Sequence, residues 1–117
     1  MWEYSIRVLR VVDGDTVDAQ VDLGFSTHKN VRIRVHGIDT PEVRTRDKAE
    51  KAKGIAATNR VKDLIANADE VVLRSHGVDK FGRCLGTIIL IGAGQEFNLA
   101  EQLILEGHGT PYFGGKR

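Results

Sequence analysis

The chain has 117 residues, of which 41% are hydrophobic and 28% charged, which is the composition of an ordinary globular domain. One cysteine, Cys84, excludes an internal disulfide, and no apolar stretch reaches the 18 residues expected of a membrane span. Its net charge of +1 is not that of a passive nucleic-acid binder, which usually carries a strong basic excess.

Three strand patterns open the chain. Residues 6–12 are apolar and β-branched, and the Asp-Gly pair at 13–14 then predicts a turn. Residues 16–23 and 31–38 alternate between apolar and polar side chains, which is typical of half-buried strands. These runs predict a meander of three strands.

A helical pattern follows at residues 47–66. Its apolar side chains recur at three- and four-residue steps: Ala49, Ala52, Ala56, Val61, Leu64, Ile65 and Ala68. Gly54 weakens the helix interior by about 1 kcal/mol relative to alanine, so packing is expected to stabilise this helix.

The last third of the chain predicts two more strands and a second helix. The strands are expected at residues 71–73 and 85–91. Asn98 is expected to cap a helix that runs through Leu105, and Gly107 to end it.

Five strands, with one helix after strand three and one after strand five, predict an α+β protein built on a five-stranded OB-fold barrel. We expect a single domain over residues 1–113 and a flexible C-terminal tail at 114–117. The N-terminus shows no signal peptide, so a cytoplasmic location is expected.

Three short segments carry side chains suited to chemistry. Asp13-Gly14-Asp15-Thr16 follows the first strand, and taken alone it is best explained as a hairpin turn. The third strand contains Arg34 and ends at Asp39-Thr40-Pro41-Glu42, a turn fixed by proline. Asp79-Lys80-Phe81-Gly82-Arg83 joins the fourth and fifth strands and is also compatible with a plain hairpin.

Together the three segments meet the requirements of phosphodiester hydrolysis. Calcium prefers several oxygen ligands, and Asp15, Asp39 and the Thr40 carbonyl supply three. Glu42 is a candidate base for activating water. Arg34 and Arg83 are available to bind the charged oxygens of the transition state bidentately.

These motifs resemble, in order and spacing, those of the staphylococcal nuclease (thermonuclease) family, from about Val8 to Gly107. The resemblance implies an OB-fold enzyme that cleaves DNA and RNA with calcium and leaves 3′-phosphate and 5′-hydroxyl ends. A nucleic-acid substrate is thus the expected partner. We expect a monomer without an obligate protein partner.

The resemblance also implies roles for individual residues. Asp15, Asp39 and the Thr40 carbonyl correspond to the calcium ligands, Glu42 to the residue that activates or orients water, and Arg34 and Arg83 to the phosphate-binding arginines. Nucleotide contacts are expected from Lys80, Tyr112 and Phe113, whereas Phe81 replaces the tyrosine of the best-known member.

A catalytically inactive OB-fold binding module is the alternative. Such a module has no need of three carboxylates beside two arginines, because negative charge opposes phosphate binding unless a metal neutralises it. The four histidines show no metal-ligand spacing and are expected at surface or packing positions, and Cys84 is expected in the core. The basic residues between Arg44 and Lys53 form either a solvated face or a guide for the nucleic-acid backbone.

Overall fold

The computed structural model describes residues 2–112, which form eight strands and two helices. The strands are β1 (Trp2–Asp13), β2 (Thr16–Asp22), β3 (His28–Val35), β4 (Gly37–Asp39), β5 (Glu70–Val78), β6 (Cys84–Gly92), β7 (Gln95–Asn98) and β8 (Thr110–Tyr112). The helices are α1 (Lys48–Ala66) and α2 (Leu99–Leu105). Phe113 and the tail expected at 114–117 lie outside the described residues.

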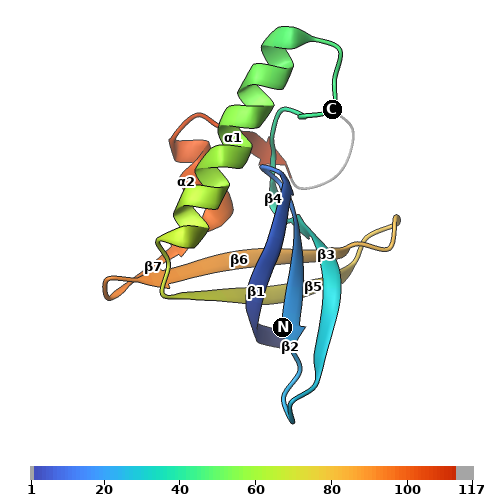
Figure 1. The fold of residues 1–117 in the computed structure, drawn as a ribbon, viewed down its shortest axis with the longest axis vertical. Helices are drawn as coiled ribbons and strands as arrows, with labels where there is room; N and C mark the ends of the chain where they lie inside the picture. The colour runs from blue at the N-terminus through green and yellow to red at the C-terminus, as the bar shows by residue number, and fades with distance from the viewer. Residues whose placement is uncertain (1, 113–117) are drawn as a thin grey trace.

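Five of the strands close into a barrel (Figure 1). Hydrogen bonds join them in the order β3-β2-β1-β5-β6, and a parallel pairing between β3 and β6 closes the ring. Strand β7 continues beyond the barrel as a hairpin with β6. The five-stranded OB-fold barrel with helices is therefore confirmed.

The barrel core follows from the alternation of side chains along each strand. Val17 and Val21 of β2 and Ile33 of β3 are buried, because residues two apart point to the same face. The strand predicted at residues 31–38 is in fact two strands. Gly37 has a φ of +88°, which L side chains rarely adopt, and this bend separates β3 from β4.

Helix α1 lies where the sequence predicts it, and the second half of the predicted apolar face is confirmed: Val61 is buried, and Leu64, Ile65 and Ala68 pack against the core. The first half of the helix buries a different face. The Asp47 carboxylate caps its N-terminus by accepting hydrogen bonds from two backbone N–H groups. Three alanines that were expected to pack are exposed: Ala49, Ala52 and Ala56. The buried positions are Gly54, Ala57, Thr58 and Val61. Gly54 faces inward because the backbone of Pro41 and Glu42 approaches the helix closely there.

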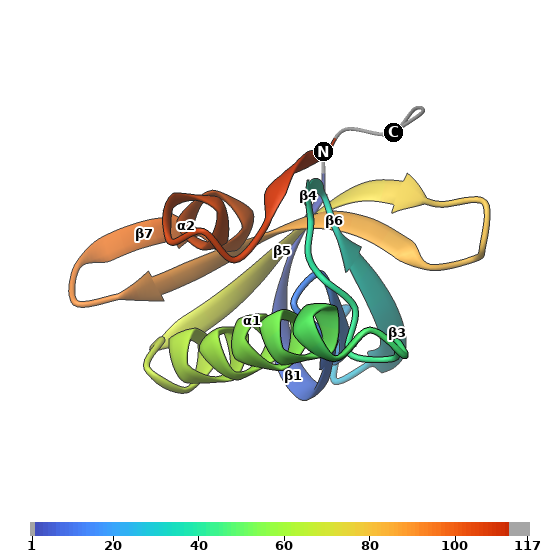
Figure 2. The ribbon, with the colours of Figure 1, turned by 90° about the horizontal axis from the view of Figure 1, so that it is seen from above.

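Helix α2 confirms the predicted limits. The Asn98 side chain accepts a hydrogen bond from the Glu101 N–H, and Gly107, with a φ of +80°, ends the helical course after Leu105. Both helices lie at one end of the barrel, away from the turn between β2 and β3 (Figure 1). Viewed from above, α1 passes across β1, which it contacts, and α2 lies beside the β6–β7 hairpin (Figure 2). Within residues 2–112, neither helix is long and apolar enough to cross a membrane.

A pairing that the sequence did not predict joins β4 to β8. Gly37 lies opposite Tyr112, and Asp39 lies opposite Thr110. Strands of three residues carry too little alternation to be recognised in a sequence. The pairing brings the end of the described chain beside Asp39.

Candidate functional site

The turn between β1 and β2 is tied to the segment that follows β4. Asp15 is 8% exposed, and its Oδ2 accepts a hydrogen bond of 3.0 Å from the Thr40 backbone N–H. Its other oxygen accepts one from the Thr16 hydroxyl. Asp13 extends the link by accepting from the Val43 N–H at 3.2 Å. The Asp-Gly turn is thus a hairpin turn that also carries a buried carboxylate to the Thr40 segment.

Glycine is required in that turn by close packing. A Cβ atom placed on Gly14 would lie 2.9 Å from Thr40 Cγ2 and 3.0 Å from Ala57 Cβ. Helix α1 thus holds the turn and the Thr40 segment together.

Arg34 lies between two of the candidate carboxylates. Its Nη2 is 3.7 Å from Asp15 Oδ2 and 3.8 Å from Asp39 Oδ1, while Nη1 donates to the Val35 carbonyl at 2.7 Å. Its side chain is 12% exposed, so water screens these charges weakly. The Tyr112 ring lies 5.8 Å from the guanidinium carbon. The structure therefore brings together Asp15, Arg34 and Asp39, three residues from separate segments.

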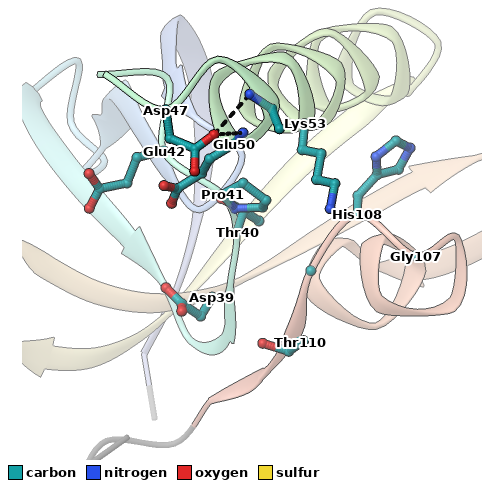
Figure 3. A pocket seen from close by; sticks show the side chains of 12 residues that line it. Asp39, Thr40, Pro41, Glu42, Asp47, Glu50, Lys53, Gly107, His108 and Thr110 are labelled. Atoms are coloured by element: carbon teal, nitrogen blue, oxygen red, sulfur yellow. Dashed lines mark hydrogen bonds between the residues drawn. The ribbon is translucent and has the colours of Figure 1, made fainter. Parts of the chain in front are cut away.

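Residues 39–42 also line a cavity of about 580 Å³. The opposite walls are the first turns of α1 and residues 107–110. In Figure 3 the carboxylates of Asp39 and Glu42 point away from Lys53 and His108 on the far wall. Glu42 is exposed to solvent. Lys53, the last of the basic residues after the turn, is exposed and faces this cavity.

Arg83 is held within its own hairpin. Its Nε donates to Asp79 Oδ2 at 2.8 Å, and its guanidinium carbon lies 5.4 Å from the centre of the Phe81 ring. Leu85 is the register partner of Arg34, so Arg83, two residues earlier, starts from the same face of the barrel as Arg34. Lys80 lies over the Phe81 ring at 5.2 Å.

One pair of histidines escaped the sequence patterns because its members are 40 positions apart. The rings of His36 and His76 lie 4.5 Å apart at an angle of 32°, and His76 Nε2 is 2.8 Å from the Thr87 hydroxyl. Partial burial and the neighbouring His36 lower the pKa of His76 below its usual value. The sequence contains one signal near this pair, a glycine at position 77 inside a strand pattern. In the structure Gly77 has a φ of +121° and adjoins the bulge in β5 that contains His76.

The metal-binding potential of the site depends on few side chains. Within the described residues, no group of three or more His, Cys, Asp or Glu side chains is arranged to hold a metal ion. A cation here would therefore need two carboxylates together with backbone carbonyls and water. Thr40 supplies one unusual feature: its Oγ1 is buried without a hydrogen-bond partner among residues 2–112.

Comparisons with known proteins identify the family of this chain. The family model described as "Staphylococcal nuclease homologue" matches residues 32–116. A micrococcal nuclease of Shigella flexneri is 35% identical over 86 residues, which cover 74% of this chain and 42% of the relative. Protein ParB of Escherichia coli is 33% identical over 82 residues, which cover 70% of this chain and 40% of the relative. An uncharacterized endonuclease of Escherichia coli O157:H7 is 34% identical over 82 residues, which cover 70% of this chain and 46% of the relative. The matched region spans less than half the length of each of these relatives.

Proposed function

This chain belongs to the staphylococcal nuclease family, and from that premise we propose that it is a calcium-dependent nuclease domain. It hydrolyses phosphodiester bonds in DNA, RNA or both, and leaves 3′-phosphate and 5′-hydroxyl ends. It acts as a monomer on nucleic acid, without an obligate protein partner.

The observation that carries the proposal is the position of Arg34 between Asp15 and Asp39. Two carboxylates beside one partly buried guanidinium leave an excess of negative charge, which repels a phosphate. A divalent cation reverses that balance and makes the same pocket attractive to phosphate. The arrangement therefore supports a metal-assisted enzyme better than a passive binding module.

The residues present fit a calcium site. Asp15 and Asp39 offer carboxylate oxygens within 3.8 Å of the same Arg34 nitrogen, so both carboxylates turn to one region. The Thr40 carbonyl would add a third oxygen, and the unpartnered Thr40 hydroxyl is consistent with a site built for a further polar group. These three residues would hold the ion, with water completing its shell. Calcium bound there would neutralise charge on the scissile phosphate.

The remaining residues act on water and on phosphate. Glu42 accepts a proton from the attacking water, whose oxygen adds to phosphorus as the bond to the 5′-oxygen breaks. The departing 5′-oxygen takes a proton from solvent water and leaves as the 5′-hydroxyl. Arg34 and Arg83 donate to the nonbridging oxygens, where negative charge increases in the transition state. Lys80, Tyr112 and Phe113 contact the adjoining nucleotide. Tyr112 is suited to this because its ring already lies beside the Arg34 guanidinium.

The test is cleavage of end-labelled DNA and RNA with calcium, with magnesium, and with calcium followed by a chelator. We expect cleavage with calcium that stops on chelation, and slow cleavage with magnesium, which demands a tighter octahedral shell. Analysis of the product ends should show 3′-phosphates. Binding of labelled strands without cleavage under every condition would contradict the proposal and favour an inactive OB-fold module.

A further inference from the structure

The carboxylate of Asp79 uses its two oxygens for different tasks. Oδ1 accepts hydrogen bonds from the backbone N–H groups of Phe81 and Arg83, each at 2.9 Å, and so fixes the turn. Oδ2 accepts from the Arg83 side chain, at 2.8 Å from Nε. The Asp79 side chain is 16% exposed, so this pair is partly shielded from water.

This contact leaves the outer end of the Arg83 guanidinium available. Only Nε is bonded to Asp79, and within residues 2–112 neither Nη1 nor Nη2 has a hydrogen-bond partner. The two Nη groups together form a fork that matches two phosphate oxygens. Phe81 is 71% exposed, yet its ring lies 5.4 Å from the guanidinium carbon and limits the directions that the side chain can take.

The other arginine of the site is already committed to the protein. Arg34 donates Nη1 to a backbone carbonyl and has Nη2 beside Asp15 and Asp39. Arg83 directly precedes β6 and lies two residues before Leu85, the register partner of Arg34, so strand alternation assigns it to the same barrel face. Of the two arginines, Arg83 is thus the one that presents a free fork on this face.

The carboxylate of Asp79 is ionised over the working range of the proposed enzyme. Burial opposes its charge, but the N–H groups of Arg83 and Phe81 and the Arg83 guanidinium together lower its pKa below the usual value. It therefore remains an acceptor for Arg83 at neutral pH.

We infer that Asp79 is a positioning residue, which holds Arg83 by Nε so that the Nη fork meets the scissile phosphate. The inference rests on the proposed nuclease function. Asp79 does not touch the substrate in this account; it acts through Arg83, by reducing the number of orientations that the guanidinium must lose in the transition state.

Asp79→Asn separates this role from the structural one. Asparagine keeps a carbonyl oxygen for the two backbone N–H groups, but its amide nitrogen cannot accept from Nε. We expect kcat to fall about 10- to 100-fold, with KM changed less than about twofold and the melting temperature nearly unchanged. Asp79→Ala removes both sets of bonds and should lower the melting temperature as well.

A matched control and a double variant sharpen the test. Asp18→Asn breaks another Arg–Asp pair on the barrel, in which Arg32 Nε lies 2.8 Å from Asp18, and should leave kcat unchanged. If Asp79 acts through Arg83, adding Asp79→Asn to Arg83→Ala should cost almost nothing further. The inference would be overturned if Asp79→Asn lowered kcat by the same factor in the wild-type protein and in the Arg83→Ala variant. It would also be overturned if Asp79→Asn kept the wild-type kcat.

A measurement on the protein alone distinguishes this inference from the proposed function. In the wild type the NMR signal of the Arg83 Nε–H should exchange slowly with water, and in Asp79→Asn it should exchange at least about tenfold faster. If the Arg83 Nε–H exchanges at the same rate in the two proteins, Asp79 does not hold Arg83 by Nε, even if the chain is a nuclease. If the Arg83 Nε–H exchanges slowly in the wild type but no nucleic acid is cleaved, the contact between Asp79 and Arg83 stands. The proposed role of that contact in catalysis and the proposed nuclease function are then both overturned.

Discussion

Gly54 of helix α1 lies against the backbone of Glu42. A Cβ atom at position 54 would come within 2.5 Å of the Glu42 carbonyl oxygen and 2.9 Å of the Pro41 carbonyl oxygen. Because both neighbours are backbone atoms, they cannot move aside as the end of a side chain can. A glycine that weakens the helix therefore allows α1 to support the segment that carries the proposed catalytic carboxylate.

Gly54→Ala should reduce activity despite the higher helix propensity of alanine. The added methyl group must displace the Glu42 segment, and we expect a loss of about tenfold or more in kcat/KM with about 1–3 kcal/mol of destabilisation. Initial rates and urea denaturation measure both. The control is Ala56→Gly, an exposed position on the same helix, which costs about 1 kcal/mol through propensity alone and should keep full activity. A more stable and fully active Gly54→Ala protein would contradict the account.

Glu42→Gln should abolish most of the cleavage without unfolding the protein. Glutamine keeps the size and polarity of the side chain but cannot take a proton from water, and loss of a positioned base typically costs about 10²–10⁴-fold in rate. Its exposed position predicts little change in stability. Single-turnover cleavage is the measurement, and Glu50→Gln, another exposed carboxylate at the same cavity, is the control. Near-normal rates in Glu42→Gln would remove Glu42 from the mechanism.

Arg83→Lys tests geometry rather than charge. Lysine keeps the positive charge but lacks the fork, so kcat should fall about 10²-fold while affinity for uncleaved substrate changes much less. Steady-state kinetics together with binding in the absence of cleavage separates the two effects. Arg32→Lys, at the arginine that pairs with Asp18, should leave both unchanged. A rise in KM with kcat intact would mean that Arg83 contacts phosphate only in the ground state.

Calcium should stabilise the folded protein through Asp39. An ion that binds only the native state at 100 times its Kd adds about 2.7 kcal/mol, which appears as a rise in melting temperature. Asp39→Asn should lose most of this rise, whereas Asp22→Asn, at an exposed carboxylate on β2, should retain it. Differential scanning calorimetry with and without calcium measures the rise in melting temperature of the wild type and of each variant. An equal rise in all three proteins would place the ion elsewhere.

His76 should make stability depend on pH below about 6.5, its ordinary pKa. Since folding lowers its pKa, the unfolded chain binds the proton first as the pH falls. The free energy of unfolding should therefore decrease from about pH 6.5 down to the folded pKa of His76. His76→Gln should flatten this part of the profile, measured by denaturation at pH 7.5 and 5.5, while His28→Gln serves as the control. The same slope in wild type and His76→Gln would show that another group is responsible.

The sequence by itself determined the local structure and the chemical inventory. Alternation in β2 and β3, the cap at Asn98 and the stop at Gly107 depend on backbone periods and on hydrogen bonds between near neighbours. A reader of the sequence can therefore predict them. The acidic and basic motifs were equally visible, because each lies within a few consecutive residues.

Only the tertiary structure decided how these segments meet. The parallel pairing of β3 with β6 closes the barrel and sets which residues share the Arg34 face, and the β4–β8 pairing brings Tyr112 to Gly37. The inward face of the first half of α1 was misjudged, because apolar spacing on a helix does not reveal that a backbone carbonyl lies opposite Gly54. Contacts of this kind join residues far apart in the chain, and they are fixed by strand register and close packing, which no local pattern records.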